Sequence, residues 1–198
     1  MKKILKDTLA LAIITIISGI ALGAVYMITK EPIAKQNEKT KIAAYNSVFS
    51  ELDSYKEYDG VEELSKVLKE KGFNGVELNE VVYAYNQKGE DIGMIITVTD
   101  RDGYAGNIKM TVGIDVEGTI TGLEILEIGE TAGLGMKAAE ADFRNQFVGI
   151  NADEVVYTKT GKVNDNEIDA ISSATITTAA VTDGVNGAIT VFNELIRR

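Results

Sequence analysis

The 198-residue sequence contains no cysteine, no histidine and no tryptophan, and it has one proline. Without cysteine the chain can form no disulfide, no Cys-ligated zinc or iron–sulfur centre and no thiol nucleophile. Without histidine it can neither hold haem through an imidazole nor build a Ser-His-Asp triad. Several classes of redox protein and hydrolase are therefore excluded before any residue is placed.

Basic residues are also scarce, because 20 Lys and Arg stand against 30 Asp and Glu for a net charge of -10. A nucleic-acid-binding surface needs the opposite balance, so we expect no nucleic-acid partner. The sequence contains three acidic pairs, Glu51/Asp53, Glu62/Glu63 and Asp165/Glu167. These pairs lack the spacing of a calcium-binding loop, and we interpret them as solvated carboxylates. We predict no metal site and no catalytic residue.

Residues 8–29 carry no charged side chain. As a helix these 22 residues would extend for roughly 33 Å, which is about the thickness of the hydrocarbon core of a bilayer. The run is longer than the ~7–15 apolar residues of a signal peptide, and no cysteine follows it to carry a lipid anchor. We therefore predict an uncleaved, single-pass anchor, with residues 1–30 forming a cytoplasmic tip and a transmembrane helix.

Charge is distributed unevenly on the two sides of this span. Residues 1–30 have a net charge of +3, which leaves -13 for residues 31–198 out of the total of -10. Three lysines crowd the first six residues, whereas the lysines after the span are spread out, and positive residues favour the cytoplasmic side. We therefore expect the chain in the cell membrane, with its C-terminal domain on the extracytoplasmic side.

Between the span and the main domain the pattern is helical. Because proline disfavours helix at the preceding residue, Glu31-Pro32 is predicted to end the membrane helix. A second helical pattern follows over residues 33–53, and a short helix is expected over residues 61–71, with Gly72 ending it. Residues 31–75 are thus interpreted as a stalk and connecting helices.

From residue 76 onward the period changes to that of strands. Four β-rich runs at residues 80–86, 92–99, 108–114 and 119–128 are separated by Asp/Gly turns, which indicates an antiparallel meander. Further elements are expected as a helix over residues 137–147, a strand over residues 154–158 and a closing helix over residues 175–196. The fold class is therefore α+β, with a domain over residues 76–198 whose antiparallel sheet is flanked by helices.

Hydroxyl side chains gather just before the closing helix and in its first turn, at Ser172, Ser173, Thr175, Thr177 and Thr178. Ser and Thr are good helix N-caps, so a purely structural role is one interpretation. The other is functional, because a helix N-terminus offers free N–H groups and partial positive charge to a phosphate. No P-loop lysine is present, so nucleotide hydrolysis is not indicated.

Two glycine-containing segments are candidates for contact with a flat ligand. Leu134 lies between Gly133 and Gly135, after Glu130-Thr131, and Tyr104 lies between two further glycines. Glycine lets a backbone approach another group closely. Taken alone, each segment is better explained as an ordinary turn.

Together these segments resemble the FMN-binding domain of the RnfG family, the G subunits of the Rnf ion-translocating ferredoxin:NAD oxidoreductase complexes. The C subunits of sodium-pumping NADH:quinone oxidoreductases are relatives of that family. The resemblance covers essentially the whole chain. The motifs that carry it are Gly103-Tyr104-x-Gly106-x-Ile108, Gly113-Ile114-Asp115-x-x-Gly118-x-Ile120, Glu130-Thr131-x-Gly133-Leu134-Gly135 and Asp169-x-x-Ser172-x-Ala174-Thr175.

The resemblance implies a covalent flavin. In the family a flavin transferase joins FMN by a phosphoester to the threonine that closes the last motif, here Thr175, and Asp169 would be part of what the transferase recognises. This chain has Ser173 and Ala132 where the family usually has glycine and proline, and Gly129 where histidine is common. The implied cofactor-binding residues are Thr175, Ser172, Ser173, Ala174, Thr177, Thr178, Glu130, Thr131, Gly133, Leu134, Gly135 and Tyr104.

The function implied is electron transfer within a membrane complex. The chain would receive electrons from one membrane partner and pass them to another centre, with no catalytic activity alone. Two alternatives remain open at this point: a flavin-free extracytoplasmic binding or scaffold domain, and a stand-alone flavin shuttle to extracellular acceptors.

Overall fold

The structure is a computed structural model that describes residues 2–196. The chain divides into two compact units, residues 1–41 and residues 42–198. The first unit is helical, whereas the second contains all the strands and the remaining helices.

Helix α1 runs without interruption over Lys2–Val48, and its residues up to Lys41 belong to the first unit. An 18-residue window of this helix has a mean hydropathy of 2.4 with none of it buried in the protein, and it is the one candidate membrane span in the described chain. The hydroxyls of Thr8, Thr15 and Thr29 each donate at 2.9 Å to the carbonyl four residues earlier. These hydroxyl groups therefore have hydrogen-bond acceptors within the helix itself, which polar groups need in an apolar solvent.

The expected helix end at Glu31-Pro32 is wrong, because Pro32 lies inside α1. Proline removes one N–H hydrogen bond and crowds the preceding turn, at a cost of about 3 kcal/mol in a helix interior. The remaining hydrogen bonds of this 47-residue helix continue on both sides, so the helix resumes beyond the proline.

The second unit is built on a five-stranded antiparallel sheet whose strands follow one another in chain order. The predicted four-strand meander is confirmed. The sequence did not reveal the first strand, which is short, largely exposed and paired along one edge only. The strands are β1 (Ser54–Glu57), β2 (Val76–Tyr85), β3 (Asp91–Asp100), β4 (Ile108–Asp115) and β5 (Ile120–Ile128).

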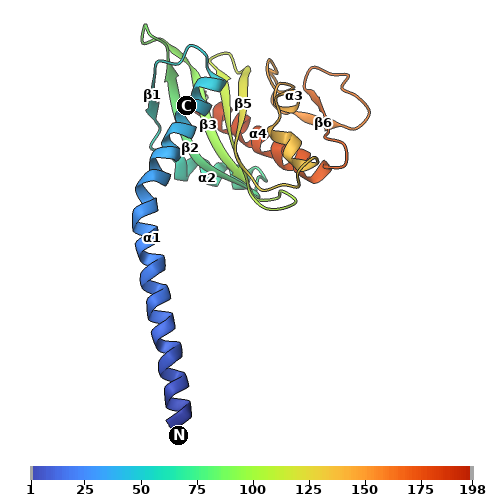
Figure 1. Cartoon of the computed structure of the whole chain (residues 1–198). Coiled ribbons are helices and arrows are strands. Elements are labelled where there is room, and N and C mark those ends of the chain that lie inside the picture. The colour runs from blue at the N-terminus through green and yellow to red at the C-terminus, as the bar shows by residue number, and fades with distance from the viewer. Residues whose placement is uncertain (1, 197–198) are drawn as a thin grey trace. The chain divides into compact units, whose positions relative to one another are not determined.

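Each face of the sheet has its own hydrophobic cluster, because neighbouring residues of a strand point to opposite sides. Ile96 of β3 belongs to the large cluster, which α4 (Thr175–Ile196) and α2 (Val61–Glu70) cover. Ile95 belongs to a small cluster with Tyr45, Val48 and Phe49, at the end of α1. Figure 1 shows α4 and the last turns of α1 on opposite faces of the sheet.

The segment between β5 and α4 is less regular than expected. The helix predicted over residues 137–147 is replaced by a 3-10 turn, η1 (Gly135–Ala139), and a one-turn helix, α3 (Ala141–Arg144). Glu140 between them has extended backbone, with ψ 147°, which separates the two pieces. The strand expected over residues 154–158 is present as β6 (Val156–Thr158), and it pairs in parallel with β7 (Glu167–Asp169).

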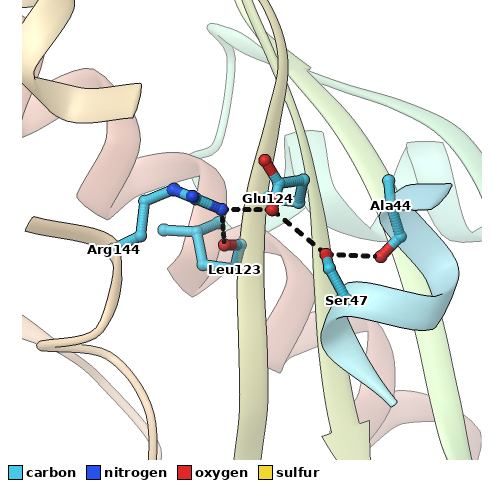
Figure 2. Close-up of polar contacts among 5 residues, drawn as sticks. All are labelled: Ala44, Ser47, Leu123, Glu124 and Arg144. Carbon is cyan, nitrogen blue, oxygen red and sulfur yellow. Dashed lines mark hydrogen bonds and ion pairs between the residues drawn. The ribbon is translucent and has the colours of Figure 1, made fainter. Parts of the chain in front are cut away.

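Polar contacts tie the end of α1 to this irregular segment across the edge strand β5. Figure 2 shows Glu124 of β5 accepting a hydrogen bond from Ser47 at 3.0 Å and forming an ion pair with Arg144. The Ser47 hydroxyl is 2.8 Å from the carbonyl oxygen of Ala44, and Arg144 also donates to the carbonyl of Leu123 at 3.2 Å. The second unit therefore includes residues 42–48 as a packed part of its structure.

Candidate functional site

A cavity of about 590 Å³ lies at the N-terminus of α4, where three separate parts of the chain meet. The turn after β3 supplies one residue, the segment from the end of β5 to the start of η1 supplies four, and the start of α4 with the two residues before it supplies five. The lining residues are Tyr104, Glu130, Thr131, Leu134, Gly135, Ser173, Ala174, Thr175, Ile176 and Thr177.

All but three of the twelve residues predicted to bind a cofactor line this cavity. Ser172 and Gly133 are exposed and outside it, and Gly133 adopts a left-handed conformation with φ +76°. Thr178 is fully buried, and its hydroxyl is bonded within the protein. Ile176 also lines the cavity and was not predicted, although a large apolar side chain beside the hydroxyl cluster was a usable signal.

The start of α4 offers free hydrogen-bond donors to this cavity. Across residues 2–196 no acceptor is paired with the amide N–H groups of Thr175, Ile176 and Thr177. The first N–H groups of a helix have no partner inside the helix, and together with the helix dipole they favour an anion. Thr175 is the first residue of α4 and is half-buried at the wall of the cavity.

In the described part of the chain, Glu130 is the one residue that brings a carboxylate to the cavity lining, and it is buried. Its Oε1 accepts a hydrogen bond from the amide of Ala105 at 3.4 Å. A Cβ on Gly135 would lie 2.7 Å from both Glu130 Oε2 and Thr177 Oγ1, so only glycine lets the loop close this tightly. The loop and the first turn of α4 therefore form one continuous wall.

The rim of the cavity is apolar and exposed. Tyr104 is 69% exposed, Leu134 is 41% exposed and Ile176 is 52% exposed. Isolated exposed apolar residues are common, but three around one cavity form a surface suited to a flat, partly apolar ligand.

The segment before α4 is fixed in place at two points. The backbone N–H of Asp169 donates to Gln146 Oε1 at 2.7 Å. The side-chain Nε2 of Gln146 in turn donates to the backbone carbonyl of Asp169 at 3.4 Å. Asp169 Oδ1 accepts from the amide of Lys162 at 2.7 Å. Asp169 thus lies outside the cavity, exposed at the end of β7, where it also orders the loop after β6.

Two family models match this chain. Residues 103–190 match the FMN-binding domain, a range that includes every residue lining the cavity. Residues 1–48 match the RnfG N-terminal region. Over its full length the chain is similar to the G subunit of the Na(+)-translocating ferredoxin:NAD(+) oxidoreductase complex of Acetobacterium woodii, with 34% identity over 98% of this chain and 94% of that protein. The chain belongs to the RnfG family.

Other relatives and solved structures agree with this assignment. The G subunit of the proton-translocating ferredoxin:NAD(+) oxidoreductase complex of Clostridium ljungdahlii is 30% identical over 90% of this chain and 86% of that protein. The fold resembles the crystal structure of the C subunit of Na(+)-translocating NADH-quinone reductase from Parabacteroides distasonis, with a TM-score of 0.61, 21% identity and coverage of 84% of this chain and 96% of that chain. This RnfG protein therefore shares its α+β fold with that protein.

Proposed function

We propose that this RnfG protein is the electron-transferring G subunit of an ion-translocating ferredoxin:NAD oxidoreductase, with FMN joined by a phosphoester to Thr175. The observation that carries the proposal is the cavity at the N-terminus of α4, which brings Thr175 together with free amide donors and an apolar rim. Its volume of about 590 Å³ is within the ~300–1,000 Å³ of typical cofactor sites.

The donor set of the cavity fits an esterified phosphate. The free amides of Thr175 and Ile176 are suited to a phosphate group at the helix N-terminus. No lysine or arginine among residues 2–196 lines the cavity, and the buried Glu130 carboxylate disfavours a second negative charge nearby. Because these features hold a free FMN dianion weakly, a covalent bond to Thr175 supplies the retention that a cationic side chain would otherwise give.

The ester bond can form without any redox step. The Thr175 hydroxyl oxygen would attack the FMN phosphorus of a flavin dinucleotide, and the pyrophosphate bond would break with a nucleoside monophosphate leaving. The hydroxyl proton passes to a base of the flavin transferase that performs the reaction. The net addition to the chain is FMN less one water.

When bound, FMN supplies one- and two-electron transfer, and the protein sets its position and surroundings. Tyr104, Leu134 and Ile176 would form the apolar bed for the isoalloxazine ring. Because this rim is exposed, neighbouring membrane proteins of the complex can approach the flavin closely enough to exchange electrons with it.

The proposed location has the domain on the extracytoplasmic side of the membrane. The support is the close spacing of Lys2, Lys3 and Lys6 on the N-terminal side of the span, whereas the lysines after the span are spread out. Covalent attachment suits this side, since a dissociated flavin would be diluted outside the cell.

Intact-mass measurement and peptide mapping of the protein purified from its own membranes test the ester. We expect a mass excess equal to FMN less one water, located on Thr175 and absent from Thr175→Ala. The matched control is Thr160→Ala, which removes an exposed hydroxyl outside the cavity and should keep the full mass excess. An unmodified wild-type mass in cells that flavinylate other proteins would contradict the proposal and favour a flavin-free binding domain.

Sidedness can be tested with a single introduced thiol, because the chain has no cysteine. Val163 is 85% exposed in the loop between β6 and β7. We expect Val163→Cys to react with a membrane-impermeant thiol reagent in intact cells. Labelling only after the cells are lysed would place the domain in the cytoplasm.

A further inference from the structure

The four residues before α4 form a tight turn. The amide of Ala174 donates to the carbonyl of Ile171 at 3.0 Å, and Ser173 has φ +64°. A positive φ at the third position alone is the geometry of a type II turn, which favours glycine there. Ser173 is the one residue other than glycine with a positive φ in the described chain, so this turn adopts a conformation that its sequence disfavours.

A single side chain bonds both ends of this turn. The Thr178 hydroxyl accepts the amide N–H of Ile171 at 3.0 Å and donates to the carbonyl of Ala174 at 3.0 Å. Thr178 is fully buried, so water does not compete for either bond. The hydroxyl therefore accepts the outward-facing N–H of Ile171, and it shares the outward-facing carbonyl of Ala174 with the backbone amide of Thr178, which donates to the same oxygen at 3.0 Å.

We propose that Thr178 is a positioning residue for flavin attachment, whose hydroxyl locks the turn at Ile171–Ala174 and so holds Thr175 at the mouth of the cavity. The inference rests on the proposed ester at Thr175. It replaces the expected contact between Thr178 and the flavin, since both hydrogen-bonding roles of this hydroxyl are already used inside the protein.

Helix α4 offers a matched control for this role. Thr182 lies one turn further along, is also buried, and donates its hydroxyl to the carbonyl of Thr178 at 2.8 Å. That bond stays within the helix and does not reach the turn. Thr182→Val therefore removes the same chemical group from the same helix and leaves the lock intact.

The test compares the initial rate of flavin incorporation into the full-length chain, using a purified flavin transferase and flavin dinucleotide. We expect Thr178→Val to be modified at least tenfold more slowly than wild type. Thr178→Ser, which keeps the hydroxyl, and Thr182→Val should both remain within about twofold. A Thr178→Val rate within twofold of that of Thr182→Val overturns the proposal.

A second variant distinguishes loss of the turn from a general folding defect. Glycine adopts the Ser173 conformation without strain, so adding Ser173→Gly to Thr178→Val should recover at least fivefold of the lost rate. Failure of the glycine to restore any incorporation counts against the turn as the cause.

Amide hydrogen exchange measured before flavin attachment separates this inference from the proposed function. The Ile171 amide should exchange at least tenfold faster in Thr178→Val, and at the wild-type rate in Thr182→Val. Unchanged Ile171 exchange in Thr178→Val overturns the lock, whatever the flavin result. A wild-type chain that takes up no flavin but shows the expected exchange refutes the ester at Thr175 and leaves the locked turn established.

Discussion

The two faces of the central sheet are covered in different ways. On one face, α4 and α2 lie over a large cluster of aliphatic side chains. On the other face, the last turn of α1 packs directly on glycines. A Cβ on Gly122 would lie 2.7 Å from the Cα of Val48, and one on its cross-strand partner Gly113 would lie 2.9 Å from Val48 Cβ.

The difference shows that the same sheet supports two kinds of close packing. Side chains that change rotamer can adjust to a small change in volume, whereas a backbone resting on glycine cannot. The face under α4 should therefore tolerate added atoms better than the face under α1. The following predictions test that difference.

The largest effect is expected for Gly122→Ala on the α1 face. The added methyl group would meet the backbone of Val48, which cannot move without displacing the end of α1. We expect a loss of about 3 kcal/mol in the free energy of unfolding, measured by urea denaturation of the full chain in detergent. Gly129→Ala is the control, because its Cβ would meet nothing closer than 3.8 Å, and it should remain within about 0.5 kcal/mol of wild type.

The polar contact on the α1 face comes next. The Tyr45 hydroxyl, buried under the end of α1, donates to Glu80 Oε2 at 2.6 Å, and burial together with this carboxylate raises the pKa of Tyr45. Tyr45→Phe should destabilise the protein by about 2 kcal/mol, since the carboxylate loses a charge-assisted bond. A double-mutant cycle with Glu80→Gln measures the coupling, and strictly additive losses would show that the pair contributes nothing.

A buried carboxyl group gives an effect that depends on pH. Asp100 at the end of β3 is 1% exposed, and its Oδ2 has no partner among the described residues. Burial and the nearby carboxylates of Asp102 and Asp183 raise the pKa of Asp100 to about 6. The folded state therefore favours the protonated form, and this group lowers stability as the pH rises from about 4 through 6.

Asp100→Asn removes the cost of ionising a buried carboxyl group. It also keeps a side-chain oxygen in place of Asp100 Oδ1, which accepts a hydrogen bond from the amide N–H of Asp102 at 2.8 Å. Relative to wild type, the variant should gain up to about 3 kcal/mol at pH ~8 and almost nothing near pH ~4, because each unit of the rise in pKa from 3.8 to about 6 corresponds to about 1.4 kcal/mol. Urea midpoints measured across this range provide the check. A difference that does not change with pH would exclude ionisation of Asp100 as its cause.

The smallest effect is expected for Gly184→Ala, the counterpart of Gly122→Ala on the α4 face. Its Cβ would lie 2.7 Å from Met110 Cε and 2.8 Å from Met110 Sδ, at the end of a flexible side chain. Alanine also gains up to about 1 kcal/mol of helix propensity over glycine. We expect a net change within about 1 kcal/mol, and a loss as large as that of Gly122→Ala would remove the contrast between the faces.

The sequence predicts the parts of the fold that have a strong period. The closing helix was expected at residues 175–196, and α4 has those bounds because its apolar residues recur at steps of three and four. The four long strands were found in their correct order, since alternating residues and Asp/Gly turns mark them clearly. Most of the cavity residues were also expected, through hydroxyl and glycine clusters that lie far apart in the sequence.

Short elements and backbone-defined features escaped prediction. Strands β1 and β7 have four and three residues, too few to show a period, and tertiary pairing alone defines them. The continuation of α1 through Pro32 depends on hydrogen bonds over many residues around a locally unfavourable one. The inward use of the Thr178 hydroxyl follows from the turn it closes, which no spacing of residue types reveals.

The position of Thr175 links the candidate site to the core of the domain. Thr175 is the first residue of α4, and the body of this 22-residue helix covers the aliphatic face of the sheet. The proposed flavin ester would therefore lie at one end of a helix that the core itself holds in place, so a substitution that loosens the core under α4 should also displace the attachment point.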